Sequence, residues 1–509
     1  MLIALVLSIL FALVVGIAAA RSKKAEAVFI PTLDVLQSIP ILGFFPIVIL
    51  AIISLFPSQL GVNIAVILLI FTSMSWNIAF GVYEAVKSIP HEYLELSSLA
   101  KTSAWNRIRS LYIPASLSRI AYNTQTSWAV GLFYLVASEI LTLGNSTYTV
   151  DHGIGVALIN FATANDWVSY TYAIIALIIA VIIWRFVFLR EFALWSEHYK
   201  FVEEPRSVHV DPLLRFYSWV NQKSIAKLFL ISHGRGVNRF TSTLQKYRRT
   251  VKYAILVGVT ILALLFSYNE VAIMLASRGV VVLPHIRLST LISVEIPVLV
   301  AFAYSFFRIW YIYMICVVIG LPLGIIISLK MKLYDTVSPA LEVISSIPAP
   351  ALLPLIILVA YGSGEVVAAI VIFIAMIWYV IFNVMAGVRT LPADYKDLAR
   401  IFQITSKHAW KEIYIPASIP AFVTGSITAV GAAWNSLIVA EYFTTGNSTQ
   451  PLTQVQFGIG KTITIATNQG DLLTLTLSII TMTVLIVAFN LTVWRRVYHY
   501  TTSKYTYNR

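Results

Sequence analysis

Two glutamates are the most informative ionisable side chains of this sequence. Glu139 and Glu441 each lie near the end of a long apolar run, in the matching contexts SEILTLGNST and AEYFTTGNST. A charge at membrane depth costs about 3 kcal/mol, so such a residue usually faces a protein interior or a polar path. We expect these carboxylates either to flank the outer mouth of a solute path, or to lie at the membrane interface or cap the loop that follows.

The other reactive side chains form no catalytic or metal-binding pattern. The eight histidines are scattered, without a His-Glu-x-x-His or paired-cysteine spacing. Cys316, the single cysteine, lies inside an apolar run, so no internal disulfide can form. We predict no metal, no cofactor and no enzymatic activity, since a membrane-bound enzyme would need clustered catalytic groups. Further polar candidates for a solute path lie on the helices that carry the two glutamates: Asn123, Gln125, Asn435 and Ser436.

The composition is that of an all-α polytopic membrane protein. Of 509 residues, 59% are hydrophobic and only 12% are charged, and the mean hydropathy is +0.82. A helix needs roughly 20 apolar residues to cross about 30 Å of hydrocarbon. We predict about eleven crossings, at 2–20, 40–56, 63–86, 117–140, 170–189, 253–275, 309–329, 347–361, 366–387, 420–442 and 472–493.

The distribution of positive charge predicts the orientation in the membrane. The net charge is +13, and many of the lysines and arginines lie in the interval 190–252. The intervals 141–169 and 443–471 contain a single lysine, Lys461. Because cytoplasmic loops are rich in Lys and Arg, we expect 190–252 and the C-terminus in the cytoplasm and the N-terminus outside. The basic charge then reflects topology and predicts no nucleic-acid partner.

The sequence contains a long internal repeat. LDVLQSIPILGFFP (33–46) matches LEVISSIPAPALLP (341–354), and LYIPAS (111–116) matches IYIPAS (413–418). The crossing at 253–275 has no counterpart in the first half. The number of crossings from the start of 2–20 to the start of its partner 309–329 is therefore even, so the two copies have the same orientation. A parallel repeat does not favour an inverted-repeat secondary transporter. We predict a first half at 1–198, a basic linker at 199–250 and a second half at 251–509.

Each copy of the repeated phrase closes a polar interval that carries an amphipathic pattern. In the first copy Tyr93, Leu96 and Leu99 form one stripe of a short helix. A second short helix follows, which we expect Pro114 to end, as Pro416 does in the second copy. Such segments can lie on a membrane surface, but two copies with the same apolar faces favour docking into a partner's groove.

The spacing in these intervals resembles the Glu-Ala-Ala loop of ATP-binding-cassette importer permeases. The matching positions are Glu95, Lys101, Leu111 and Pro114 in the first copy, and Asp397, Gln403, Ile413 and Pro416 in the second. The family's glycine is replaced by Lys101 and Gln403. The resemblance implies type I permease domains in tandem, with 5 + 6 helices, and two coupling helices. It also implies two copies of a separate ATPase subunit, an extracellular solute-binding protein and membrane lipid as partners.

Other segments are similar to the nitrate, sulfonate and taurine branch of that family, namely SIPAPALLPLIILVAYGSGE, AWNSLIVAEYF and the GIG segments. The resemblance implies a small anionic or zwitterionic solute. The alternative is a secondary transporter or channel that works without an ATPase. Asn145 and Asn447 stand in Asn-Ser-Thr triplets of the outer loops and are either glycosylation acceptors or polar turn residues.

Overall fold

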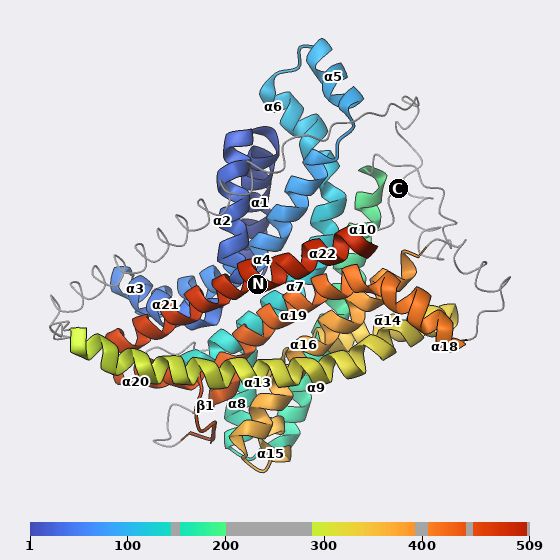
Figure 1. Cartoon of the computed structure of the whole chain (residues 1–509). Coiled ribbons are helices and arrows are strands. Elements are labelled where there is room, and N and C mark those ends of the chain that lie inside the picture. The colour runs from blue at the N-terminus through green and yellow to red at the C-terminus, as the bar shows by residue number, and fades with distance from the viewer. Residues whose placement is uncertain (57, 144–152, 200–287, 392–405, 444–450, 506–509) are drawn as a thin grey trace.

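The computed structural model describes residues 1–56, 58–143, 153–199, 288–391, 406–443 and 451–505, and these are nearly all helical (Figure 1). Several predicted features lie outside the described residues: the crossing at 253–275, the linker from residue 200, the coupling candidates Asp397 and Gln403, and the glycosylation candidates Asn145 and Asn447.

The first half begins with a helical hairpin and continues through long and short helices in alternation. Pro114 lies within a helical stretch that runs from Ala104 to Leu143. The elements are α1 (Leu2–Arg21), α2 (Lys23–Ser38), α3 (Ile41–Leu55), α4 (Ser58–Lys87), α5 (His91–Leu99), α6 (Ala104–Arg107), the π-helical turn η1 (Ile108–Tyr112), α7 (Ile113–Leu143), α8 (Ile154–Thr163), α9 (Trp167–Ile183), the π-helical turn η2 (Trp184–Leu189), α10 (Arg190–Ser196) and η3 (Glu197–Tyr199).

The second half repeats this order of elements. Its π-helical turns η5 and η6 occupy the places of η1 and η2, and its two short strands pair antiparallel. The elements are α13 (Leu288–Leu329), α14 (Met331–Ser345), η4 (Ala349–Leu352), α15 (Leu353–Val359), α16 (Gly364–Arg389), α18 (Ser406–Ala409), η5 (Trp410–Tyr414), α19 (Ile415–Glu441), β1 (Tyr442–Phe443), β2 (Thr453–Gln454), α20 (Ile459–Gln469), α21 (Leu472–Phe489), η6 (Asn490–Trp494) and α22 (Arg495–Tyr505).

Close helix contacts recur at equivalent positions of the two halves. A Cβ added to Gly16 would lie 2.8 Å from Val82, and one added to Gly324 would lie 2.8 Å from Val384. Because glycine has no Cβ at these positions, the backbone of α1 can pack closely against α4, and that of α13 against α16. The duplication read from the sequence is therefore also a duplication of packing.

The lone cysteine has a counterpart in this repeat. The Cys316 thiol faces the carbonyl oxygen of Phe373 at 3.9 Å, and the Ser8 hydroxyl donates to the carbonyl of Phe71 at 3.2 Å. Both side chains are fully buried. Cys316 thus holds a packing position that serine holds in the first half.

Seven of the described helices are long and apolar enough to cross a membrane, or eight if the bent pair of α14 with η4 and α15 counts as one crossing. The predicted number of eleven is not confirmed. The predicted crossing at 40–56 corresponds to α3, which has only 15 residues. The crossing predicted at 309–329 is the second part of α13, whose 42 residues give a length of about 63 Å.

An aromatic cluster around Trp310 packs against the end of α21 and η6. Trp310 packs edge-on against Phe489 and parallel to Trp494, and the Tyr313 hydroxyl donates to Ser426 at 2.8 Å. Helix α13 continues for about 20 residues before this cluster. The aromatic rings therefore join α13 to the end of α21 and to η6.

The contacts between the two halves occur in equivalent pairs. An element of the first half contacts the second half in the same way as its counterpart in the second half contacts the first. Helix α3 packs on α19 and α20, while η4, its counterpart, packs on α7 and α8. Likewise α2 contacts α21, and α14 contacts α9. Contacts that recur in this way define a pseudo-twofold relation, as in an isologous dimer. One direct bond across the interface runs from the Tyr170 hydroxyl to the Ala351 carbonyl at 2.9 Å.

Candidate functional site

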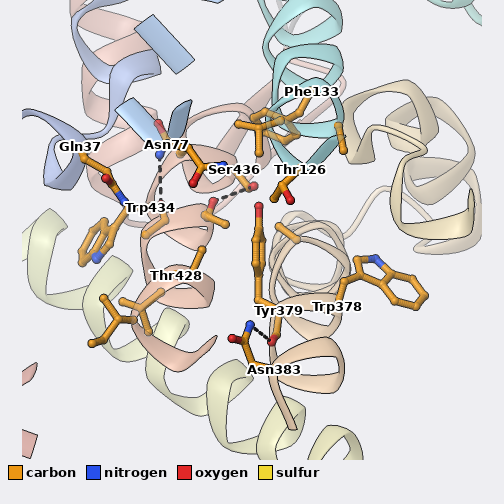
Figure 2. A pocket seen from close by; sticks show the side chains of 18 of the residues that line it. Gln37, Asn77, Thr126, Phe133, Trp378, Tyr379, Asn383, Thr428, Trp434 and Ser436 are labelled. Carbon is orange, nitrogen blue, oxygen red and sulfur yellow. Dashed lines mark hydrogen bonds between the residues drawn. The ribbon is translucent and has the colours of Figure 1, made fainter. Parts of the chain in front are cut away.

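A cavity of 1170 Å³ lies between the two halves. Its walls come from α4, α7 and η2 of the first half, and from α14, α16, α19 and η6, among others, of the second. Figure 2 shows part of this lining, with Asn77 and Thr126 of the first half facing Tyr379 and Ser436 of the second. The cavity is large enough for a small solute and its water.

The lining combines aromatic, aliphatic and polar side chains and carries little charge. Among the described residues around the cavity, only Arg185, Glu342 and Arg495 are charged. Arg185 of the first half forms an ion pair with Glu342 of the second, and their side chains are 14% and 35% exposed. The positive charge of Arg185 is therefore matched by a carboxylate from the opposite half, and most of the cavity surface consists of aromatic, amide and hydroxyl groups.

The repeat relates some lining residues as identical pairs and others as unlike pairs. Trp76 corresponds to Trp378, and Thr126 to Thr428. In contrast, Asn77 corresponds to Tyr379, and Tyr134 to Ser436. In each of these two unlike pairs one half holds a tyrosine, and the equivalent position of the other half holds a smaller polar residue.

All four polar candidates from the sequence line this cavity: Asn123, Gln125, Asn435 and Ser436. The Asn123 amide donates to the carbonyl of Asn77 at 2.9 Å, and the Asn77 amide donates to the Ser127 hydroxyl at 3.1 Å. The Asn435 amide donates to the Gly431 carbonyl at 3.0 Å, whereas its buried side-chain oxygen has no partner among the described residues. The structure therefore brings the amides of both halves to one space.

The two glutamates do not line the cavity. The buried Glu139 carboxylate accepts the Gly155 N–H at 2.6 Å, and the buried Glu441 carboxylate accepts the Gly460 N–H at 2.7 Å. These amides belong to the first turns of α8 and α20, where carboxylates are favoured partners. Each carboxylate thus caps the short helix that follows it, which fixes α8 on α7 and α20 on α19.

The glycines of the GIG segments leave room for these carboxylates. A Cβ on Gly153 would overlap the Glu139 carboxyl group, and a Cβ on Gly458 would overlap that of Glu441. Both glycines have extended backbone, with φ −171° at Gly153 and 177° at Gly458, so the requirement is space and not backbone conformation. This contact explains why a glycine precedes each of the two short helices.

Arg308 is a site residue that the sequence reading missed. It contacts Glu441 in a buried ion pair and binds Glu365 with two further bonds of 2.8 and 3.0 Å. The Ser305 hydroxyl also donates to Glu441, at 2.6 Å. Arg308 was expected before the start of a crossing, but α13 is already helical there. The signal was a single arginine within the aromatic run FAYSFFRIWYIYM.

The first loop that resembles a coupling loop has an ordered turn at Lys101. Lys101 adopts φ +49°, the left-handed conformation that glycine favours. The hydroxyls of Ser97 and Thr102 lie 2.7 Å apart, and Arg107 donates to the Ser97 hydroxyl at 2.9 Å. Lys101 therefore has a left-handed backbone conformation at the position where the resembled family has glycine. The hydrogen bonds among Ser97, Thr102 and Arg107 stabilise this turn.

Pro114 and Pro416 do not end a helix, contrary to the sequence prediction. The chain stays helical from α6 through η1 into α7, and from α18 through η5 into α19. Each proline is the second residue after a π-helical turn. A proline removes one i to i−4 hydrogen bond, and a π-helical turn accommodates the local mismatch without breaking the helix.

The remaining coupling candidates lie at this end of the helices. Glu95 and Lys101 are exposed, and Leu111, Pro114, Ile413 and Pro416 are half-buried. Figure 1 shows α5 and α6 projecting beyond the rest of the helices. Three large apolar side chains of this projection are solvent-exposed, Leu96 at 54%, Leu99 at 78% and Trp105 at 67%.

Comparison with known proteins gives two matching regions and a consistent set of relatives. The chain is 31% identical over 159 residues to a nitrate import permease of Leptolyngbya laminosa, a match that covers 31% of this chain and 53% of that protein. It is 32% identical over 132 residues to a bicarbonate transport system permease of Synechococcus elongatus, covering 26% of this chain and 47% of that protein.

A permease of Bacillus subtilis named for aliphatic sulfonates is 28% identical over 123 residues, covering 24% of this chain and 44% of that protein. The chain thus spans about half the length of these curated relatives. The family described as the binding-protein-dependent transport system inner membrane component matches at residues 12–192 and again at 317–499. The chain belongs to this family of transport permeases and contains the family's domain twice.

Proposed function

We propose that this chain forms the membrane pathway of an ATP-binding-cassette importer, with both permease domains supplied by one polypeptide. The observation that carries this proposal is the cavity of 1170 Å³ whose walls come from both halves. Permeases of this kind move a solute between two domains that rock against each other. The interface contacts that recur with the halves exchanged suit such a motion, because neither half is rigidly enclosed by the other.

The projecting loop supports coupling to a separate ATPase. The exposed apolar side chains Leu96, Leu99 and Trp105 form a docking surface for a groove in a partner. We propose that residues 93–113 and 395–415 are the two coupling segments, with Glu95 and Asp397 at matching positions. One ATPase copy would bind each segment. The basic interval 190–252 and the C-terminus would lie on the same, cytoplasmic side.

The solute proposed is a small oxyanion, or a zwitterion with an oxyanion group. The relatives named above are named for nitrate, bicarbonate and aliphatic sulfonates. Each of these ions presents several oxygen acceptors around one centre, and the cavity lining is rich in amide and hydroxyl donors. An extracellular binding protein would deliver the ion to the outer mouth.

Reconstitution tests this function directly. The full chain would be placed in proteoliposomes with the ATPase and binding protein encoded beside it, and uptake of labelled nitrate, bicarbonate and taurine would be measured with and without ATP. The proposal predicts uptake of at least one solute that needs ATP and binding protein. Uptake driven by an ion gradient alone would instead identify a secondary transporter.

The coupling assignment needs a separate variant. Replacing Glu95 and Asp397 together by alanine should weaken co-purification of the ATPase and lower ATP-driven uptake. Asp335→Ala, at an exposed position of α14 outside both proposed segments, serves as the matched control. Unchanged complex formation and uptake in the double variant would refute this assignment without affecting the assignment of the cavity.

A further inference from the structure

Four side chains at the middle of the cavity form what we term the hydroxyl cluster: Thr126 and Tyr134 from the first half, and Tyr379 and Ser436 from the second. Figure 2 shows the Tyr379 hydroxyl pointing toward Ser436 and Thr126. These residues lie on three long helices, α7, α16 and α19. The cluster therefore bridges the two halves at a position that rigid elements define.

Three of these hydroxyls are available as donors. Those of Thr126, Tyr134 and Tyr379 make no hydrogen bond to any described residue, whereas Ser436 donates to the Ala432 carbonyl at 2.9 Å. Tyr134 is only 4% exposed. A buried phenol hydroxyl nearly always has a hydrogen-bond partner. Its position on the cavity wall leaves this hydroxyl open to a partner in the cavity, either water or solute.

The two positions at which the halves carry different residues make this site asymmetric. Tyr134 stands where the second half has Ser436, and Tyr379 stands where the first half has Asn77. A symmetric pair of identical domains would present each tyrosine twice and leave less space between the halves. In this chain one phenol from each half faces smaller polar groups, which leaves room for a molecule of a few heavy atoms beside the pseudo-twofold axis.

The chemistry of the cluster selects a ligand with oxygen acceptors. Hydroxyl and amide groups can donate to the oxygens of a nitrate, a bicarbonate or a sulfonate. Arg185 and Glu342 neutralise each other elsewhere on the wall, and Arg495 is the first residue of α22. Neutral donors bind an anion less tightly than a fixed cation does, and a transported ion must be able to leave its site.

We propose that the hydroxyl cluster is an internal binding site for the transported oxyanion, and that Tyr134 and Tyr379 are its specific donors. This inference rests on the proposed function, because it assigns the solute contacts of that same pathway. Each of the two fused halves would then contribute one phenol donor to the site, Tyr134 from the first half and Tyr379 from the second.

The test is the double substitution Tyr134→Phe with Tyr379→Phe, which removes two hydroxyls and keeps both rings. The matched control is Tyr172→Phe, a tyrosine of α9 that is 68% exposed and does not line the cavity. Wild type and both variants, assembled with ATPase and binding protein in proteoliposomes, would be given labelled nitrate, bicarbonate and taurine. The readout is the number of solute molecules taken up per ATP hydrolysed.

A hydrogen bond to a charged group corresponds to about a tenfold effect or more. We expect the double variant to lose at least tenfold in solute taken up per ATP, and the Tyr172→Phe control to match the wild type. Equal yields for the double variant and the wild type would overturn the inference and leave the proposed function standing. Absence of ATP-dependent uptake by the wild type would overturn both.

Discussion

The buried ion pair between Arg308 and Glu441 gives a sharp energetic prediction. The side chains are 4% and 0% exposed, and the carboxylate also accepts from Ser305 and Gly460. Arg308→Met would leave a buried carboxylate without its cation, at a cost of about 3–5 kcal/mol. Glu441→Gln should cost less, about 2 kcal/mol, because Arg308 keeps two bonds to the half-exposed Glu365.

The double variant distinguishes this ion pair from general packing. If the two charges stabilise each other, the loss in the double variant should be smaller than the sum of the single losses by at least about 1 kcal/mol. The assay is unfolding of the purified protein in mixed micelles titrated with SDS. Glu139→Gln in the first half is the matched control and should add to Arg308→Met without coupling. Additive losses for Arg308 and Glu441 would refute the ion-pair account.

Three further predictions concern the loops and the orientation. Lys101→Gly should stabilise the first coupling turn by about 1 kcal/mol, measured by thermal unfolding, because glycine adopts a positive φ without a Cβ clash; a loss of stability would contradict this. Gly458→Ala should destabilise by about 2 kcal/mol through overlap with the Glu441 carboxylate, whereas Gly431→Ala, which has open space, should change stability by less than about 0.5 kcal/mol. A cysteine introduced by Val220→Cys should react with an impermeant thiol reagent only from the cytoplasmic side, and reaction from outside would contradict the charge-based orientation.

The sequence was sufficient for the class and for the repeat because both depend on pattern. Apolar runs identify helical membrane segments, and matched phrases such as LYIPAS and IYIPAS locate the duplication. The relation of Glu139 to Glu441 was also visible, and the structure gives both the same hydrogen bond to the following helix. The confirmed family membership rests on these same two regions.

Local helix boundaries and the hydrogen-bond partners of side chains were harder to predict from the sequence. The prolines predicted a break before α7 and α19. In the structure a π-helical turn precedes each proline, and the helix continues although the proline lacks an N–H donor. Arg308 lies 133 residues from Glu441 in sequence, so no local pattern joins them. The predicted number of crossings is not confirmed, partly because α3 and α15 are apolar but short. These features depend on tertiary contacts and not on periodicity.

The cavity shows why a parallel repeat alone does not define a site. The alignment of the halves pairs Asn77 with Tyr379 and Tyr134 with Ser436, but only the fold brings all four to one space. The unlike pairs are where the halves have diverged, whereas Trp76 and Trp378 have remained the same. The two halves therefore differ at two positions of the lining that a solute would contact.

The central claim is that this cavity is the pathway and that its access alternates. Thr428, exposed to the cavity, would be replaced by cysteine in a Cys316→Ser background, which the serine at the equivalent position Ser8 makes a mild change. Val318→Cys, 73% exposed on α13, is the control outside the cavity. The measurement is labelling by a charged thiol reagent added from either side, in the assembled transporter with its ATPase.

We predict that the cysteine at 428 reacts from one side in the absence of nucleotide and from the opposite side when the ATPase is trapped with ATP and vanadate. The cysteine at 318 should show no such exchange. Labelling at 428 that is the same from one side in both states, or absent from both sides, would contradict the account.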